Sequence, residues 1–425
     1  MKSFLSGASL SIDARLLSRL ITCMPYLLCL TAFCLRLFRL NFHPIWFDED
    51  LAYQRATAAL DVALASMNGA PLYYLLLRGW AELTGHSLYA LRFLSMLCGT
   101  LTVPLIYQLG RRLLGVRLAL GVAFIATFTP FYIYYSQEAR TYALTLVLML
   151  VSLYAFLRWR ATLRWVDLFW CSLANLICLY THYVTLLVIA AQGAFLLATI
   201  PLCWKKIGTF VAGQTLVVLA LVPWLWRVQN ALLRVVAPAD STVLDPWSIL
   251  ARTWIEFGVG RAIAPPFSLY LAGVPLFLAL AGLLSLFAKP SFGRATTSPW
   301  TESRLILLIW LIVPLAGTML LPRASVRFSP KYLIAITPVF YLLVLLGLRA
   351  LHQESRVLFM AGLALLIGIW LLALGDYYLQ PLNKLAQRST LPIVMQGERR
   401  LEKSELLFTR DSADRETNLF EQRWI

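Results

Sequence analysis

Three adjacent carboxylates, Asp48, Glu49 and Asp50, come directly after the first long apolar segment of the chain. Acidic residues are scarce in this sequence: of its 21 Asp and Glu residues, seven fall within residues 398–425. Carboxylates beside a bilayer are costly unless they are solvated, paired or used in chemistry. A carboxylate so placed can take the proton from a hydroxyl group while the oxygen attacks an electrophile. The acidic run is therefore the first candidate for a catalytic site.

Three other polar clusters interrupt the apolar sequence, at residues 137–140, 181–183 and 323–331. Together they supply cations, a further carboxylate and a histidine. Lys and Arg side chains can neutralise the charge that builds on a departing phosphate. The sequence has no Gly-rich phosphate loop and no Ser/His/Asp signature. Carboxylates with cations at a membrane surface instead suit group transfer from a phosphate-linked donor.

Membrane-spanning helices must position these clusters. The sequence is 60% hydrophobic and 14% charged, with a mean hydropathy of +0.72, whereas soluble proteins are about half apolar and about a quarter charged. Continuous apolar runs of spanning length favour an all-α polytopic membrane protein over a barrel. Window hydropathy predicts about eleven spans, near residues 21–40, 88–109, 116–135, 141–157, 165–181, 183–203, 207–226, 268–288, 304–321, 332–350 and 356–374.

Basic residues predict the orientation. The short Lys- and Arg-rich connections fall on the same side as the basic N-terminus, and the positive-inside rule makes that side cytoplasmic. All four polar clusters then lie on the outer side, as an active site built from several loops requires. We expect a multi-pass protein of the inner (plasma) membrane whose site faces the periplasm or the exterior.

The segments outside the spans carry further expectations. Residues 41–87 are expected to form one or two interfacial helices that hold the acidic run, and residues 227–267 are expected to form a lid. The basic and then apolar N-terminus is typical of an uncleaved signal anchor. Residues 1–374 are expected to form the transmembrane domain, and residues 375–425 a polar, periplasmic tail that is short for an independent domain.

Charge and cysteine content argue against nucleic-acid-binding, disulfide-rich and zinc-binding classes of protein. The net charge of +16 lies largely in short loops, so it favours the lipid bilayer and phosphate-bearing lipids as partners and does not predict nucleic-acid binding. The seven cysteines lie in or beside apolar segments and form neither a disulfide framework nor a zinc pattern.

Several motifs in order resemble the GT-C superfamily of membrane glycosyltransferases. The resemblance is to the branch of protein O-mannosyltransferases, lipid A aminoarabinose transferases and RgtA/B/C/D-like enzymes, and it is best over residues 20–225. Its motifs are Asp48-Glu49 after the first span, Ala70-Pro71-Leu72-Tyr73-Tyr74-Leu75-Leu76-Leu77, Leu91-Arg92-Phe93-Leu94-Ser95 leading to Gly110-Arg111-Arg112-Leu113, Tyr135-Ser136-Gln137-Glu138-Ala139-Arg140-Thr141-Tyr142-Ala143-Leu144, and Tyr180-Thr181-His182-Tyr183. The Ser-Gln-Glu-Ala-Arg block is the most specific of them.

The resemblance implies transfer of a sugar from a polyprenyl-phosphate donor to a lipid, glycan or protein acceptor, usually with inversion. It makes Asp48 the base or the residue that positions the acceptor, with Glu49 beside it as the second catalytic candidate. The substrate-binding candidates are Glu138 and Arg140 in the donor cavity, His182 and Tyr183, and Arg327 and Lys331 for the lipid phosphate.

The chain also departs from the family pattern at two places. Gly69-Ala70-Pro71 stands where relatives often have His-Pro-Pro, and Lys331-Tyr332 stands where an Arg-Tyr pair is common. Lysine keeps the charge at that position but lacks the bidentate fork of arginine for a phosphate.

Other interpretations stay open at this level. The acidic run also suits a solvated helix N-terminus. No cofactor is indicated with certainty, and a divalent metal held by Asp48, Glu138 and His182 is an alternative that no ligand spacing supports. A transporter or lipid flippase is the main alternative function, although the charges gather at one face instead of in mid-span. A polysaccharide polymerase or ligase is chemically close to the main prediction.

Overall fold

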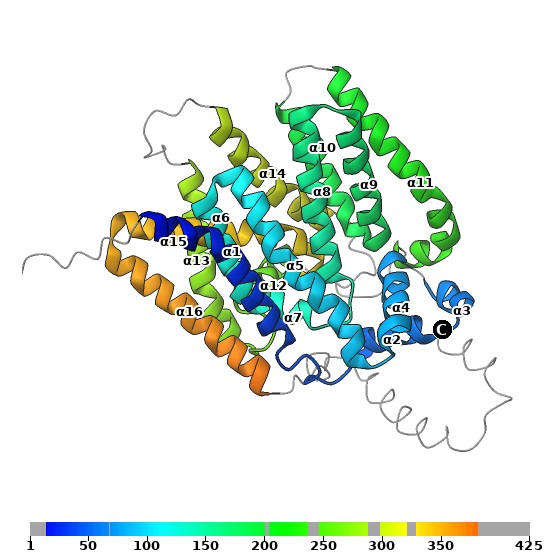
Figure 1. The fold of residues 1–425 in the computed structure, drawn as a ribbon, viewed down its shortest axis with the longest axis horizontal. Coiled ribbons are helices and arrows are strands. Elements are labelled where there is room, and N and C mark those ends of the chain that lie inside the picture. Colours follow the sequence, from blue (N-terminus) through cyan, green and yellow to red (C-terminus); the bar gives the residue numbers. More distant parts are fainter. Residues whose placement is uncertain are drawn as a thin grey trace, which may run out of the picture. The chain divides into compact units, whose positions relative to one another are not determined.

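The structure, a computed structural model, describes residues 14–67, 69–199, 204–236, 246–287, 298–320 and 329–380. Every regular element in these ranges is helical, as predicted (Figure 1). In chain order the elements are α1 (Ala14–Leu37), α2 (Phe47–Thr57), α3 (Leu60–Ala65), α4 (Leu72–Thr84), α5 (Leu88–Leu114), α6 (Val116–Phe128), α7 (Pro130–Ser136), α8 (Tyr142–Thr162), α9 (Trp165–Thr181), η1 (Tyr183–Thr185), α10 (Leu186–Thr199), α11 (Trp204–Val236), α12 (Pro246–Val259), α13 (Phe267–Phe287), α14 (Ser298–Leu320), η2 (Pro330–Ile336), α15 (Thr337–Glu354) and α16 (Arg356–Leu379).

The described residues contain seven helices that are long and apolar enough to cross a membrane, or eight if the bent pair α6 and α7 forms one span. They lie in α5, α8, α11, α13, α14, η2 with α15, and α16. The remaining predicted spans coincide with shorter apolar helices, Ile21–Leu37, Trp165–Thr181 and Tyr183–Thr199. The protein is therefore an all-α, multi-pass membrane protein, and a count of eleven spans requires these three shorter helices to cross as well.

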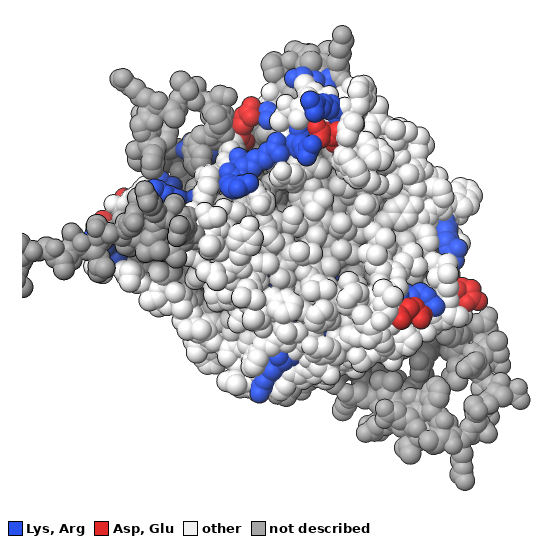
Figure 2. All heavy atoms as spheres, viewed as in Figure 1, with Lys and Arg blue, Asp and Glu red and all other residues white. Residues whose placement is uncertain are grey.

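Charge is distributed as such a protein requires. Figure 2 shows a broad face almost without Lys, Arg, Asp or Glu, with charged side chains gathered toward its edges. Several large apolar side chains, such as Phe169, Leu284 and Leu371, are more than half exposed at the protein surface. Apolar exposure on this scale suits contact with lipid, because water contact would cost about 25 cal/mol per Å².

Helices α8, α9, α10 and α11 form one packed group (Figure 1). Inside it, Asn175 of α9 lies at the centre of a buried polar network. Its Nδ2 donates to Gln192 Oε1 at 3.0 Å and to Gln214 Oε1 at 2.9 Å, and Ser152 Oγ donates to its Oδ1. Hydrogen bonds of this kind hold helices together where the hydrophobic effect is weak.

Helices α13 and α15 pack closely because glycine faces backbone in both. A Cβ atom at Gly282 would lie 1.9 Å from the carbonyl oxygen of Leu343, and one at Gly347 would lie 1.9 Å from that of Leu278. Neither position can therefore accept a side chain without separating the two helices. Small residues are the usual means of close helix approach in membranes.

One expectation about the segments between spans needs correction, and the helix bounds add detail to two others. Residues 41–87 form three short helices, α2, α3 and α4, instead of one or two. Within residues 227–267, expected to form a lid, α11 runs on to Val236 and α12 begins at Pro246; the lid itself stays a prediction. Helix α16 continues to Leu379, so the expected tail starts inside a helix; residues 381–425 lie outside the described residues.

Candidate active site

The first turn of α2 sends its two leading carboxylates to different environments. Glu49 is fully buried, and both of its oxygens bind Arg92 of α5: Nε to Oε1 at 2.9 Å and Nη2 to Oε2 at 2.8 Å. Its Oε1 also accepts the backbone N–H of Ala139 at 2.9 Å. Glu49 therefore ties α2 to α5 and to the loop between α7 and α8.

Asp48 is the more accessible of the two, with 20% of its side chain exposed. Its Oδ2 lies 3.4 Å from Lys331 Nζ and 3.8 Å from Arg140 Nη2. Arg140 Nη1 also donates to the backbone oxygen of Asp48 at 2.8 Å. These ion pairs are longer than a charge-assisted hydrogen bond of about 2.7–2.9 Å, so the carboxylate is held near cations without being locked to them.

Further side chains complete what we call the Asp48 cluster: Asp48, Arg55, Tyr74, Arg140, Tyr142 and Lys331. Arg140 Nη1 lies 3.2 Å from Tyr74 Oη, and the Arg55 guanidinium lies 4.7 Å from the Tyr74 ring centre. Lys331 Nζ lies 4.9 Å from the Tyr142 ring centre. Burial lowers the pKa of Arg55, and the nearby Tyr74 and Asp48 act against that shift. The cluster thus sets three cations against one carboxylate.

The members come from several separate parts of the chain. Asp48 and Arg55 lie in the first and last turns of α2, Arg140 lies in the turn after α7, and Lys331 lies in η2. Acidic residues favour the first turn of a helix, where they meet the positive end of its dipole. Helices α2 and α4 pack on each other, and α4 contacts α5 and α9 (Figure 1), which fixes them at one end of the helix bundle.

His182 lies beside this cluster. Its ring centre is 6.2 Å from that of Tyr142 and 5.8 Å from that of Tyr332, and its Nδ1 accepts the backbone N–H of Val184. Burial lowers the pKa of His182 to about 4, with Arg140 and Lys331 adding to the shift. The imidazole is therefore neutral at pH 7. Its neutral form avoids a fourth positive charge beside the cations of the cluster.

Tyr183 has a different neighbour. Its hydroxyl accepts a hydrogen bond from Trp224 Nε1 at 3.2 Å, and the same N–H lies 3.1 Å from the carbonyl oxygen of Gly69. These contacts join α11 to the turn before α4. Tyr183 thus helps to hold α11 against the segment that precedes α4, one of the helices that contribute to the Asp48 cluster.

Glu138 belongs to a second buried set, the Glu256 group: Tyr134, Tyr135, Glu138, Glu256 and Arg261. Arg261 Nε lies 3.5 Å from Glu256 Oε1, and Tyr135 Oη donates to Glu256 Oε2 at 3.2 Å. Burial raises the pKa of Glu256, although Arg261 and Tyr135 act in the other direction. Burial also works against the charge on Arg261, but Tyr134, Tyr135, Glu256 and Glu138 outweigh it and raise the pKa of Arg261.

Two predictions about ligands have a plain outcome. Within the ranges that the structure describes, no three His, Cys, Asp or Glu side chains are grouped so that they could hold a metal ion. Asp48, Glu138 and His182 are therefore not brought together as a metal triad. Arg327 lies outside the described residues.

Sequence reasoning missed several parts of the site. Arg55, Tyr74 and Tyr142 lie in the Asp48 cluster, and Arg92 holds Glu49. Arg92 had a usable signal, because a charged residue inside an apolar span calls for a partner. Glu256 and Arg261 had no such signal, since they lie between spans.

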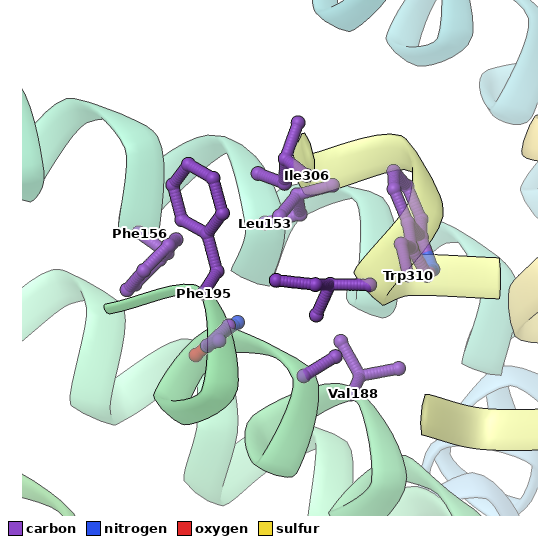
Figure 3. Close-up of a pocket in the computed structure, with 9 residues that line it drawn as sticks. Leu153, Phe156, Val188, Phe195, Ile306 and Trp310 are labelled. Carbon is purple, nitrogen blue, oxygen red and sulfur yellow. The ribbon is translucent and has the colours of Figure 1, made fainter. Parts of the chain in front are cut away.

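An apolar pocket lies between α8, α10 and α14 and contains none of the predicted site residues (Figure 3). Apart from Gln192, its lining is apolar or aromatic. The labelled side chains are Leu153, Phe156, Val188, Phe195, Ile306 and Trp310. With this lining it offers no groups for acid–base chemistry, so the Asp48 cluster remains the candidate site.

Comparison with known proteins supports the motifs described above. Residues 68–226 match the family model described as dolichyl-phosphate-mannose-protein mannosyltransferase. None of the curated proteins matches the chain.

Solved structures share the fold. ArnT from Cupriavidus metallidurans in the apo state aligns with a TM-score of 0.56 at 16% identity, over 82% of this chain and 62% of that one. The same protein bound to undecaprenyl phosphate gives 0.52 at 15% identity, over 86% and 75% of the two chains. The Archaeoglobus fulgidus oligosaccharyltransferase in the apo form gives 0.54 at 15% identity, over 84% and 56%.

This chain therefore spans less than two thirds of the length of the apo ArnT and oligosaccharyltransferase chains. Likeness at this level of identity concerns the fold, which is GT-C-like. The family match and the fold together confirm the resemblance predicted from the sequence. Residues 68–226 therefore match the model of a family of membrane glycosyltransferases, described as dolichyl-phosphate-mannose-protein mannosyltransferase.

Proposed function

We propose that this protein is a membrane glycosyltransferase that moves a sugar from a polyprenyl-phosphate donor to an acceptor hydroxyl. The observation that carries the proposal is the Asp48 cluster, in which one accessible carboxylate lies 3.4 Å and 3.8 Å from two cations. Such a site combines a base with groups that stabilise a leaving phosphate. The undecaprenyl phosphate in the ArnT structure supports a lipid-phosphate donor.

In the proposed step, the acceptor oxygen attacks the anomeric carbon of the sugar while Asp48 takes the hydroxyl proton. The bond between that carbon and the phosphate oxygen breaks, and its electron pair leaves with the phosphate. Arg140 and Lys331 neutralise the charge on the departing lipid phosphate, and Arg55 adds to the positive potential. A single displacement of this kind inverts the anomeric configuration.

Glu49 takes a different role in the proposal from the catalytic one expected from sequence. Both of its oxygens are bound by Arg92, and one also accepts the Ala139 amide. It therefore acts as a positioning residue that orients α2 and Asp48. Glu138, within the Glu256 group, borders the donor cavity instead of touching the reacting atoms.

The proposed setting is the outer side of the inner membrane. With eleven spans and a cytoplasmic N-terminus, the turns that hold Asp48, Arg140, His182 and Lys331 all face the periplasm or exterior. The three shorter apolar helices support this count. The acceptor is a lipid, a glycan or a protein that reaches this face.

Purified protein in nanodiscs, incubated with radiolabelled polyprenyl-phosphate sugars and envelope glycolipids, tests the proposal. We expect labelled acceptor together with free polyprenyl phosphate. Asp48→Asn should reduce transfer by at least about a hundredfold, the usual scale for a general base. The matched control is Asp50→Asn, because Asp50 lies in the same acidic run and its Oδ2 accepts a hydrogen bond from Gln54.

Two results would overturn the proposal. One is substantial transfer by Asp48→Asn while the protein remains correctly inserted. The other is movement of the lipid-linked sugar across the bilayer without cleavage of its phosphate bond, which would indicate a transporter or flippase.

A further inference from the structure

Arg36 is a fully buried charge in the last turns of the apolar helix α1. Its guanidinium donates to four neutral oxygens: Ala126 O at 2.9 Å, Ser136 Oγ at 3.2 Å, Ala32 O at 3.2 Å and Thr127 O at 3.3 Å. Burying an arginine is costly unless its donors are satisfied. Two of these oxygens, those of Ala126 and Thr127, lie in the last turn of α6, and the Ser136 hydroxyl lies at the end of α7.

At the junction between α6 and α7, Arg36 takes the place of a missing backbone N–H donor. The two helices meet at a bend of 58°. In a continuous helix the carbonyl of Ala126 would accept the N–H of residue 130, but that residue is Pro130, which has no N–H. Arg36 Nη2 supplies the missing donor at 2.9 Å. A backbone carbonyl in an apolar bundle needs such a partner.

The same arginine is connected to the end of α7 and to the site. Its Nε contacts Ser136, and the next residue, Gln137, donates from Nε2 to the carbonyl oxygens of Arg36 at 2.7 Å and Phe38 at 2.8 Å. Gln137 Oε1 in turn accepts the hydroxyl of Tyr377 at 2.7 Å. We call Arg36, Gln137 and Tyr377 the latch.

The residues that follow the latch reach both leading carboxylates of the acidic run. The Ala139 amide binds Glu49, and Arg140 binds the backbone and lies near the carboxylate of Asp48. We infer that Arg36 is a positioning residue: through the latch it fixes the bend at Pro130 and so places residues 138–140 against the acidic run. The catalytic consequence rests on the proposed function, whereas the placement of the loop does not.

Hydrogen–deuterium exchange of the full-length protein in nanodiscs tests the placement. We expect Arg36→Met to speed exchange of the peptide that contains residues 137–142 by about tenfold or more, because local opening follows loss of local contacts. Arg36→Lys keeps the charge but cannot reach all four oxygens, so its effect should be smaller. Tyr377→Phe removes one latch bond and should give a still smaller increase, which keeps the test decisive if Arg36→Met does not fold.

The matched control is Arg112→Met. Arg112 Nη2 also donates to a backbone oxygen, that of Leu157 at 3.0 Å, but it lies in the last turn of α5 and its hydrogen bond is to α8 and not to a latch residue. This variant should leave exchange in residues 137–142 unchanged. Equal acceleration by Arg36→Met and Arg112→Met, or acceleration near residue 36 alone, would overturn the inference.

A double-mutant cycle on sugar transfer tests the catalytic consequence. Arg36→Met and Gln137→Leu act through one loop, so their combined loss of kcat/KM should be within about threefold of the larger single loss. A combined loss equal to the product of the two single losses would refute the role of Arg36 in positioning the site. If the wild-type protein transfers no sugar, the proposed function fails, and the exchange experiment still decides whether the latch holds the loop.

Discussion

The two sides of the first turn of α2 differ in how they hold a carboxylate. On one side, Glu49 is fully buried and makes contacts of 2.8–2.9 Å with Arg92 and Ala139. On the other, Asp48 is partly exposed, and its cations lie at 3.4 Å and 3.8 Å. The residues are adjacent in sequence, but successive helix positions point about 100° apart.

This difference separates stability from reactivity. A buried pair with complete hydrogen bonding is rigid, and its carboxylate has no room for a substrate. A loosely held carboxylate beside cations can exchange a lysine or arginine contact for a substrate hydroxyl or phosphate. We therefore expect changes on the Glu49 side to affect unfolding and changes on the Asp48 side to affect transfer.

Glu49→Gln tests the stability side and should have the largest effect. It leaves the Arg92 guanidinium buried without its carboxylate, which typically costs about 3–5 kcal/mol of unfolding free energy. Denaturation followed by tryptophan fluorescence in mixed micelles measures it. A loss below about 1 kcal/mol would show that the pair is not structural in this sense.

Lys331→Met tests the reactive side. It removes one of the two cations beside the Asp48 carboxylate, so we expect transfer to fall by about a hundredfold, as for loss of one transition-state donor, with little change in unfolding. Lys331→Arg is the control: it keeps the charge and adds a bidentate fork, so transfer should stay within about tenfold of wild type. A large loss of unfolding free energy in Lys331→Met would contradict the assignment of stability to the Glu49 side and transfer to the Asp48 side.

His182 sharpens the comparison through pH. Its pKa in the folded protein is about 4, compared with an ordinary value of 6.5, because of burial and the nearby Arg140 and Lys331. The unfolded chain therefore binds the proton first, so stability is complete above pH 6.5 and falls as the pH drops toward 4. Thermal unfolding across this range should show a shallower pH dependence in His182→Gln than in wild type. Identical curves would contradict the assignment.

Glu82→Gln should have the smallest effect. Glu82 pairs with Arg78 of the same helix at 3.5 Å, with 58% of its side chain exposed. Exposed pairs of this spacing contribute about 0.3–0.5 kcal/mol. The same unfolding assay provides the measurement, and a loss comparable with that of Glu49→Gln would show that the assay does not distinguish buried from exposed pairs.

Hydropathy was sufficient to predict the helical class and the approximate spans, because spanning length and apolar character are local properties of the sequence. It was not sufficient for helix ends. Helix α11 continues through residues 227–236, which include two arginines, a glutamine and an asparagine, and α16 continues through Asp376. Their backbone hydrogen bonding continues beyond the apolar window that defines a span.

The site was predictable in its residue types and less so in its pairings. Asp48, Arg140 and Lys331 meet as expected, although Lys331 lies 283 positions along the chain from Asp48. The separation of Glu49 from Asp48 was not predictable, because it depends on Arg92, 43 positions away in another helix. A sequence can show that two loops lie on the same side of the membrane. Which residue of another helix a side chain pairs with is set by the packing of the helices.

The polar network around Asn175 also bears on how the protein is assembled. Its members come from α8, α9, α10 and α11, which are synthesised in that order. Until α11 arrives, the Asn175 amide lacks its bond to Gln214, so a bundle of the three earlier helices is incomplete. The four helices therefore reach their lowest free energy together, and a chain truncated before α11 would lose one of the two hydrogen bonds that the Asn175 amide donates.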